Sequence, residues 1–89
     1  MRVSYFEWDD YNVNHIAEHG VDPLEVEEVF KNRPLIRKGR QGLYQAFGQT
    51  DEGYYLFVVF RHKGKETARV ITARDMDEAE RRYYQRHGK

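Results

Sequence analysis

The sequence predicts an α+β domain, in which two N-terminal helices pack on an antiparallel sheet of four or five strands and a third helix closes the chain. Three observations predict this class. Two early segments carry helix start and stop signals, four later apolar segments are separated by glycine turns, and the last segment has a polar helix pattern. Turns this short join antiparallel strands, since parallel strands need long crossovers.

The length and composition allow one small core, so residues 1–89 are expected to form a single domain. Seven tyrosines, five phenylalanines and one tryptophan supply much of its volume. The chain has no cysteine, which excludes a disulfide framework and thiolate zinc ligation. No segment approaches the ~20 apolar residues of a membrane span, and the first residues lack the apolar run of a signal peptide. A soluble cytoplasmic protein without membrane contact is therefore expected.

The first elements are a strand and a short helix. Residues 3–8 are rich in the aromatic and β-branched side chains typical of a strand. Residues 9–20 follow as a helix that Asp9 or Asp10 can cap, and Gly20 stands where a left-handed residue commonly ends a helix.

The second helix has stronger signals at both ends. Asp22 is its predicted N-cap, Pro23 takes the first helical position, and Glu25 completes a capping box with Asp22. Pro34 ends the helix, because proline cannot continue it.

After this helix the pattern changes to that of β-strands. Four short segments are separated by "GRQG", "TDEG" and "KGKE", each with glycine where a turn needs it. The stretch "YYLFVVF" is nearly all apolar, so it is predicted to be a central strand covered on both faces. The predicted strands span residues 35–38, 43–49, 54–62 and 66–74.

The last predicted helix begins at an Asp75 N-cap, with Glu78 at the capping-box position. Arg74 therefore stands at the joint between a strand and a helix. There we expect a fixed cation beside the positive end of the helix dipole, able to hold a phosphate. The alternative is a local ion pair with one of the acids that follow it: Asp75, Asp77 or Glu78.

The net charge of zero hides an asymmetry between two parts of the chain. Residues 1–32 carry two Lys/Arg against eight Asp/Glu, whereas residues 33–89 carry thirteen against seven. If these parts occupy different faces, the basic one would attract phosphates and the acidic one a basic protein. The alternative is two solvated surfaces.

Two histidines, His15 and His19, stand one turn apart in the first predicted helix. His19 can serve as a general base near neutral pH, and the alternative is a residue that the helix dipole favours at a C-terminus. The spacing also suits zinc, but no third ligand is evident, so no metal site is expected. The sequence has neither a GxGxxG nor a GxxxxGK[ST] motif, so no nucleotide cofactor is expected.

Arginine and tyrosine supply the remaining candidates for a functional site. Arginine can clamp a phosphate with two donors and stack on bases, and tyrosine can stack or donate a hydrogen bond, so this set suits RNA. The alternative is a solvated helix face beside core rings. The candidates on or beside the predicted sheet and last helix are Arg37, Lys38, Arg40, Tyr44, Arg61, Arg69, Arg74, Arg81, Arg82, Tyr83 and Tyr84.

Three segments of the chain carry a family resemblance that runs from Phe6 to about Tyr84. They are "FEWDDYNVNHIAEHGVDPLEVEEVF", "GLYQAFGQTDEGYYLFVVF" and "RVITARDMDEAERRYY". Within them stand, in order, Glu7-Trp8-Asp9, His19-Gly20-Val21 and Thr72-Ala73-Arg74. These motifs and their spacing resemble those of the BrnT family, and the chain looks like a divergent branch of it.

The resemblance implies a RelE-like ribonuclease fold and the toxin of a type II toxin–antitoxin module. Such a toxin inhibits translation, and its partner would be a DNA-binding antitoxin from an adjacent gene. Its metal-independent chemistry would be attack of the RNA 2′-OH on the adjacent phosphate, which needs a base, cations and an acid. The alternative is a member that has lost catalysis and binds protein or nucleic acid.

If the resemblance holds for the activity, three residues are expected to carry the reaction. Arg61 and Arg74 would clamp the phosphate, and His19 would be the acid/base group. The expected RNA contacts are Arg40, Tyr44, Arg81 and Tyr84.

Overall fold

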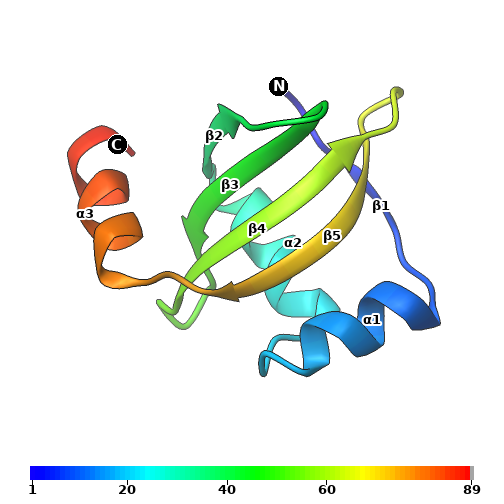
Figure 1. The fold of residues 1–89 in the computed structure, drawn as a ribbon, viewed down its shortest axis with the longest axis horizontal. Helices are drawn as coiled ribbons and strands as arrows, with labels where there is room; N and C mark the ends of the chain where they lie inside the picture. The colour runs from blue at the N-terminus through cyan, green and yellow to red at the C-terminus, as the bar shows by residue number, and fades with distance from the viewer. Residues whose placement is uncertain (89) are drawn as a thin grey trace.

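The computed structural model describes residues 1–88, which form three helices and one five-stranded sheet (Figure 1). Among these residues, no helix has both the length and the apolar character needed to cross a membrane. The elements are β1 (Tyr5–Glu7), α1 (Asp10–Ala17), α2 (Pro23–Lys31), β2 (Leu35–Lys38), β3 (Leu43–Gln49), β4 (Tyr55–His62), β5 (Thr67–Asp75) and α3 (Glu78–His87).

The sheet has the strand order β1-β5-β4-β3-β2. Strands β2 to β5 form an antiparallel meander, whereas β1 lies parallel to β5, with Tyr5 opposite Thr67. The predicted α+β class and order of elements are confirmed, and the sheet is mixed because of its first strand. Two helices separate β1 from the meander, so no tight turn dictates the direction in which it pairs.

Helices α1 and α2 cover one face of the sheet, which we call the helix face. In Figure 1, α2 passes behind the strands. Ile16 from α1 and Val26 from α2 pack with the strand residues Val58, Phe60 and Val70 in one fully buried cluster. This cluster is the main core, and its burial supplies most of the driving force for folding.

The opposite face, which we call the open face, carries a smaller core at one end. Phe47 and Phe57 from the sheet and Met76 from the link to α3 are buried together, and Tyr83 of α3 packs against them. The ring centroids of Phe47 and Tyr83 lie 5.1 Å apart. In Figure 1, α3 stands at the end of the sheet where β5 finishes, far from the β4–β5 turn. Among residues 1–88, no helix covers the rest of this face.

The predicted N-caps of α1 and α2 agree with the structure, as does the left-handed Gly20 after α1, whereas α2 ends at Lys31, before Pro34. Asp9 caps α1, and Asp22 caps α2 in a capping box with Glu25. Gly20 has φ +77°, and Val21 N–H donates to the carbonyl of Ile16 at 3.1 Å, which is the six-residue hydrogen bond of a Schellman motif.

The predicted start of the last helix was wrong by two residues. Asp75 ends β5, where it pairs with Leu56, and the following N–H of Met76 donates to the carbonyl of Tyr55 at 3.0 Å. These sheet hydrogen bonds hold the chain extended. Asp77 is the N-cap instead, and its capping box uses Glu80.

Candidate functional site

A row of side chains crosses the open face from β2 to α1. Strand pairing places Arg37 opposite Gln45, Gln45 opposite Val59, and Val59 opposite Thr72. Arg37 Nε donates to Gln45 Oε1 at 2.9 Å, and His15 Nε2 lies 3.2 Å from Thr72 Oγ1 at the other end. The row therefore joins a guanidinium, an amide, a hydroxyl and an imidazole on one surface.

Two predicted cations flank this row on the same face. Side chains alternate along a strand, so Phe57, Val59 and Arg61 of β4 point to the open face. Arg74 is opposite Phe57 in β5, and its guanidinium carbon lies 4.6 Å from the centre of the Phe57 ring. Arg61 is exposed and forms no ion pair within residues 1–88. The structure thus brings Arg61 and Arg74 to one surface.

Arg74 already has an acidic partner, and it is not one of the three acids expected from the sequence. Its Nη1 and Nη2 atoms donate to Oε1 and Oε2 of Glu80 at 2.9 and 2.8 Å. The Nη1 atom also donates to the carbonyl of Asp75 at 3.1 Å. The hydrogen bonds that it donates to Glu80 raise the pKa of the Arg74 guanidinium further above its usual range. Arg74 is consequently fixed by contacts on two sides and by the Phe57 ring.

A third arginine of the sheet, Arg69, is neutralised by acids from the β1–α1 segment. Its Nη1 lies 3.3 Å from Glu7 Oε1 and 3.0 Å from Asp9 Oδ2. The hydrogen bond from Arg69 is the main cause that lowers the pKa of Asp9 below its usual value. Arg69 therefore holds β1 and α1 to the sheet and adds little positive charge to the open face.

His15, which was not a predicted catalytic residue, is the histidine that reaches the sheet. Asn12 Nδ2 donates to the carbonyl of Val70 at 3.1 Å and fixes α1 along the edge of β5. One turn later His15 meets Thr72, whereas the exposed His19 lies beyond it with 5.4 Å between the two ring centroids. The only signal in the sequence was the spacing of four residues, which predicts both imidazoles on one side of the first helix.

The four predicted RNA contacts are spread over the molecule. Tyr44 lies on the helix face, where its ring centroid is 5.8 Å from that of Phe60. Arg40 is exposed in the β2–β3 turn. Arg81 and Tyr84 belong to α3 and contact Tyr55, with the Arg81 guanidinium carbon 4.1 Å from its ring centre. Burial raises the pKa of Tyr84. None of the four joins the row on the open face.

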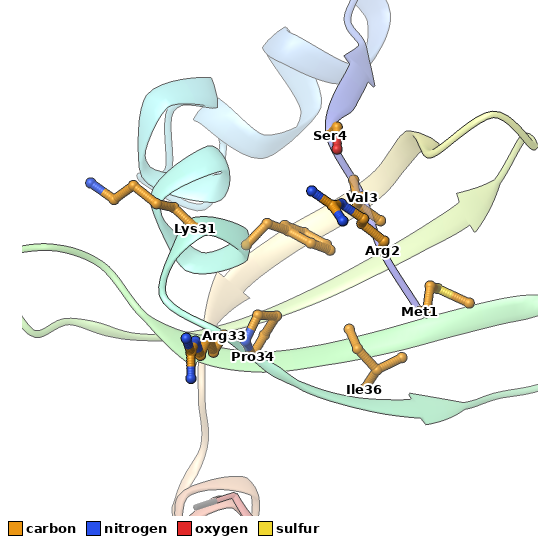
Figure 2. Close-up of a pocket in the computed structure, with 9 residues that line it drawn as sticks. Met1, Arg2, Val3, Ser4, Lys31, Arg33, Pro34 and Ile36 are labelled. Atoms are coloured by element: carbon orange, nitrogen blue, oxygen red, sulfur yellow. The ribbon is translucent and has the colours of Figure 1, made fainter.

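A hollow of about 670 Å³ is on the helix face (Figure 2). It lies between the N-terminal residues, the end of α2 and β2, with Phe30, Pro34 and Ile36 among its lining. Lys31 at its rim is bound to Asp51 at 2.8 Å, and Figure 2 shows its side chain directed away from the hollow. This hollow is separated by the sheet from Arg61 and Arg74.

The donors of the open face are guanidinium, amide, hydroxyl and imidazole groups. Within residues 1–88 no cluster of three or more His, Cys, Asp or Glu side chains is placed to bind a metal ion. An exposed cationic surface of this kind fits a phosphate backbone better than an apolar ligand, which needs a concave apolar pocket.

The fold and the site define a small α+β protein with arginine side chains on one face of its sheet. The chain belongs to the BrnT toxin family: the family model described as "Ribonuclease toxin, BrnT, of type II toxin-antitoxin system" matches residues 8–80. Its fold is similar to that of the Brucella abortus ribonuclease toxin BrnT in a crystal structure, with a TM-score of 0.65 and 20% sequence identity. The likeness covers 88% of this chain and 100% of that one. No curated protein sequence matches the chain.

Proposed function

We propose that the protein is a RelE-like, metal-independent endoribonuclease toxin that acts on RNA in the cytoplasm and thereby inhibits translation. The observation that supports this most is the row on the open face, which ends in His15 and is flanked by Arg61 and Arg74. Membership of the family supports RNA as the target and an antitoxin as the partner.

The proposed reaction needs no nucleophile from the protein. The RNA 2′-oxygen forms a bond to the adjacent phosphorus as its proton leaves, the bond from phosphorus to the 5′-oxygen breaks, and that oxygen takes up a proton. His15 is the proposed acid/base group, in the role that the sequence suggested for its neighbour His19. Arg61 and Arg74 stabilise the negative charge that builds up on the phosphate oxygens, where a fixed cation contributes most.

Cleavage is expected to continue in excess EDTA, because the proposed donors are side chains of the protein. The products should end in a 2′,3′-cyclic phosphate or a 3′-phosphate, as 2′-OH attack requires. The measurement is cleavage of an end-labelled single-stranded RNA, with product ends identified by mass spectrometry. Activity that EDTA abolishes and a divalent ion restores would contradict the mechanism, as would 5′-phosphate products.

The antitoxin is proposed to bind the open face and α3, and to be a DNA-binding protein from an adjacent gene. The acidic part of the chain, residues 1–32, supplies α1 and α2 on the helix face, whereas the basic part supplies the meander and α3. Charge complementarity therefore favours the basic side for an acidic partner segment.

In hydrogen exchange, the antitoxin is expected to protect residues 61–86 of the toxin. Amides of β5 and α3 would be shielded by the partner and stabilised by docking. The measurement compares exchange of the free toxin and of the complex by mass spectrometry. Protection limited to residues 9–31 would show that the acidic helices form the interface instead.

A second candidate function is binding without catalysis. The ion pair between Arg74 and Glu80 favours it, because a guanidinium already paired with a carboxylate has less positive charge to offer a phosphate. Expression in a bacterial host distinguishes the two. An endoribonuclease toxin should arrest growth unless its antitoxin is present, whereas a binding module should leave growth unchanged.

A further inference from the structure

We infer that Glu80 is the positioning residue for Arg74, which it orients so that the other edge of the guanidinium is free to bind an RNA phosphate. This inference rests on the proposed function, since it assigns a phosphate to the open face. A guanidinium has five N–H donors arranged as two forks: one formed by Nη1 and Nη2, the other by Nε and Nη2. Glu80 takes only the first of these.

The donor count shows what remains. Of the five N–H groups of Arg74, two bind Glu80 and one binds the carbonyl of Asp75. Within residues 1–88, the Nε–H and the second N–H of Nη2 have no hydrogen-bond partner. These two donors are parallel and adjacent, which is the geometry that binds two oxygens of one phosphate. The side chain of Arg74 is 36% exposed, so part of it is open to a ligand.

The contacts around the guanidinium hold it in one orientation. Glu80 is more buried than its partner, with 17% of its side chain exposed, and the Phe57 ring lies 4.6 Å from the guanidinium carbon. A planar group fixed by a fork on one edge and a ring on one side loses less entropy when a ligand binds. The negative charge of Glu80 also weakens the long-range attraction between Arg74 and a phosphate. Arg74 therefore acts through its short hydrogen bonds, while Arg61 supplies unpaired positive charge.

Glu80 has a second function, and the chain contains a matched control for it. Glu80 Oε1 accepts a hydrogen bond from the Asp77 N–H at 2.9 Å in the capping box of α3. Glu25 makes the same contact with the Asp22 N–H at 3.1 Å in α2, and it has no arginine partner. Glutamine also completes a capping box, but its amide nitrogen cannot accept from a guanidinium. Glu80→Gln therefore breaks the two-pronged hydrogen bond with Arg74 and keeps the capping box of α3.

The test compares Glu80→Gln with Glu25→Gln in single-turnover cleavage of a labelled RNA. Glu80→Gln is expected to lower the maximal rate at least about 10-fold, with half-saturating protein concentration changed less than about 3-fold, because a misoriented donor affects the transition state more than binding. Glu25→Gln should keep the wild-type rate. A rate for Glu80→Gln equal to or above the wild type would overturn the inference and show that the carboxylate only quenches Arg74.

A second readout does not depend on catalysis. The ¹⁵N-labelled Nε–H of Arg74, assigned by its loss in Arg74→Lys, is followed by NMR as a non-cleavable RNA with 2′-deoxy substitutions is added. The resonance should be sharp in the wild type, should shift on titration, and should broaden in Glu80→Gln. If the wild type fails to cleave RNA but the resonance behaves in this way, the proposed catalysis fails and the positioning role stands. A resonance that is unmoved by the RNA overturns the positioning role.

Discussion

Replacing Arg74 with alanine is expected to slow RNA cleavage at least about 100-fold, the scale seen when one fixed donor to a developing negative charge is removed. Arg74 is held by Glu80, by the Asp75 carbonyl and by the Phe57 ring, so its free donors are oriented before the substrate arrives. Arg74→Lys should recover only part of the rate, because an ammonium group cannot form the two-pronged contact. The measurement is single-turnover cleavage at saturating protein.

Thermal and chemical unfolding must accompany this assay, because Arg74 is not a free surface cation. Removing Arg74 leaves the partly buried Glu80 carboxylate without its two hydrogen bonds from the guanidinium. This loss is expected to lower the free energy of unfolding by ~1–3 kcal/mol. Arg2→Ala is the control: it removes one positive charge at an exposed pair with Glu66 and should cleave like the wild type. Wild-type cleavage by folded Arg74→Ala would rule out a catalytic role and direct the search to Arg61 and Arg37.

Most of the fold could be predicted because its signals are local. Asp22, Pro23 and Glu25 specify the start of α2 within four residues, and Gly20 specifies the end of α1 by its left-handed backbone. The glycine turns likewise indicated the boundaries between β2 and β3, between β3 and β4, and between β4 and β5. In each case the residues that determine the structure are adjacent in sequence, so composition and spacing are sufficient.

The start of α3 shows where local signals fail. The sequence offers two capping boxes, Asp75 with Glu78 and Asp77 with Glu80, and both have the same spacing. Pairing of Asp75 with Leu56 in β4 decides between them, because the extended backbone of a paired strand cannot also begin a helix. That contact joins residues about twenty positions apart, and no local pattern contains it.

Part of the site could have been deduced from strand alternation, and part could not. Tyr44 and Phe60 lie opposite each other on the helix face, so the period of two separates Tyr44 from Gln45 on the open face. The position of His15 beside Thr72 depends on how α1 lies along the edge of β5, where Asn12 donates a hydrogen bond to the carbonyl of Val70. A helix pattern predicts which side chains share a side, but not which strand they meet.

Charge counts from the sequence overstate the free charge of the open face. Arg69 is paired with Glu7 and Asp9, and Arg74 with Glu80, although these partners are far apart in sequence or belong to different elements. A paired arginine adds little long-range electrostatic attraction, because its charge and that of its partner cancel beyond a few ångströms. What it offers instead is a set of hydrogen-bond donors in a fixed position. Under the proposed function, unpaired cations such as Arg61 would attract the RNA and the paired ones would orient it.

Replacing His15 with glutamine is expected to lower the cleavage rate about 100-fold or more, within the range for loss of a general acid/base group. Glutamine can still hydrogen-bond to Thr72, so the substitution removes proton transfer while keeping the contact that ends the row. RNA affinity, measured by fluorescence anisotropy with the 2′-deoxy RNA, should change less than about 3-fold, since the arginines remain. The rate should be measured from pH 5 to pH 9.

The companion variant His19→Gln decides between the two histidines. The His19 ring packs on that of His15 at 5.4 Å, and among residues 1–88 only His15 of the two has a side-chain hydrogen bond to the sheet, so the loss of His19 is expected to slow cleavage less than about 5-fold. A larger effect of His19→Gln than of His15→Gln would return the acid/base role to His19 and imply that α1 shifts when RNA binds. Equal, small effects would show that neither imidazole moves the proton. Stabilisation of the phosphate by arginine would then account for the catalysis, because fixed cations lower the barrier without any change in their protonation.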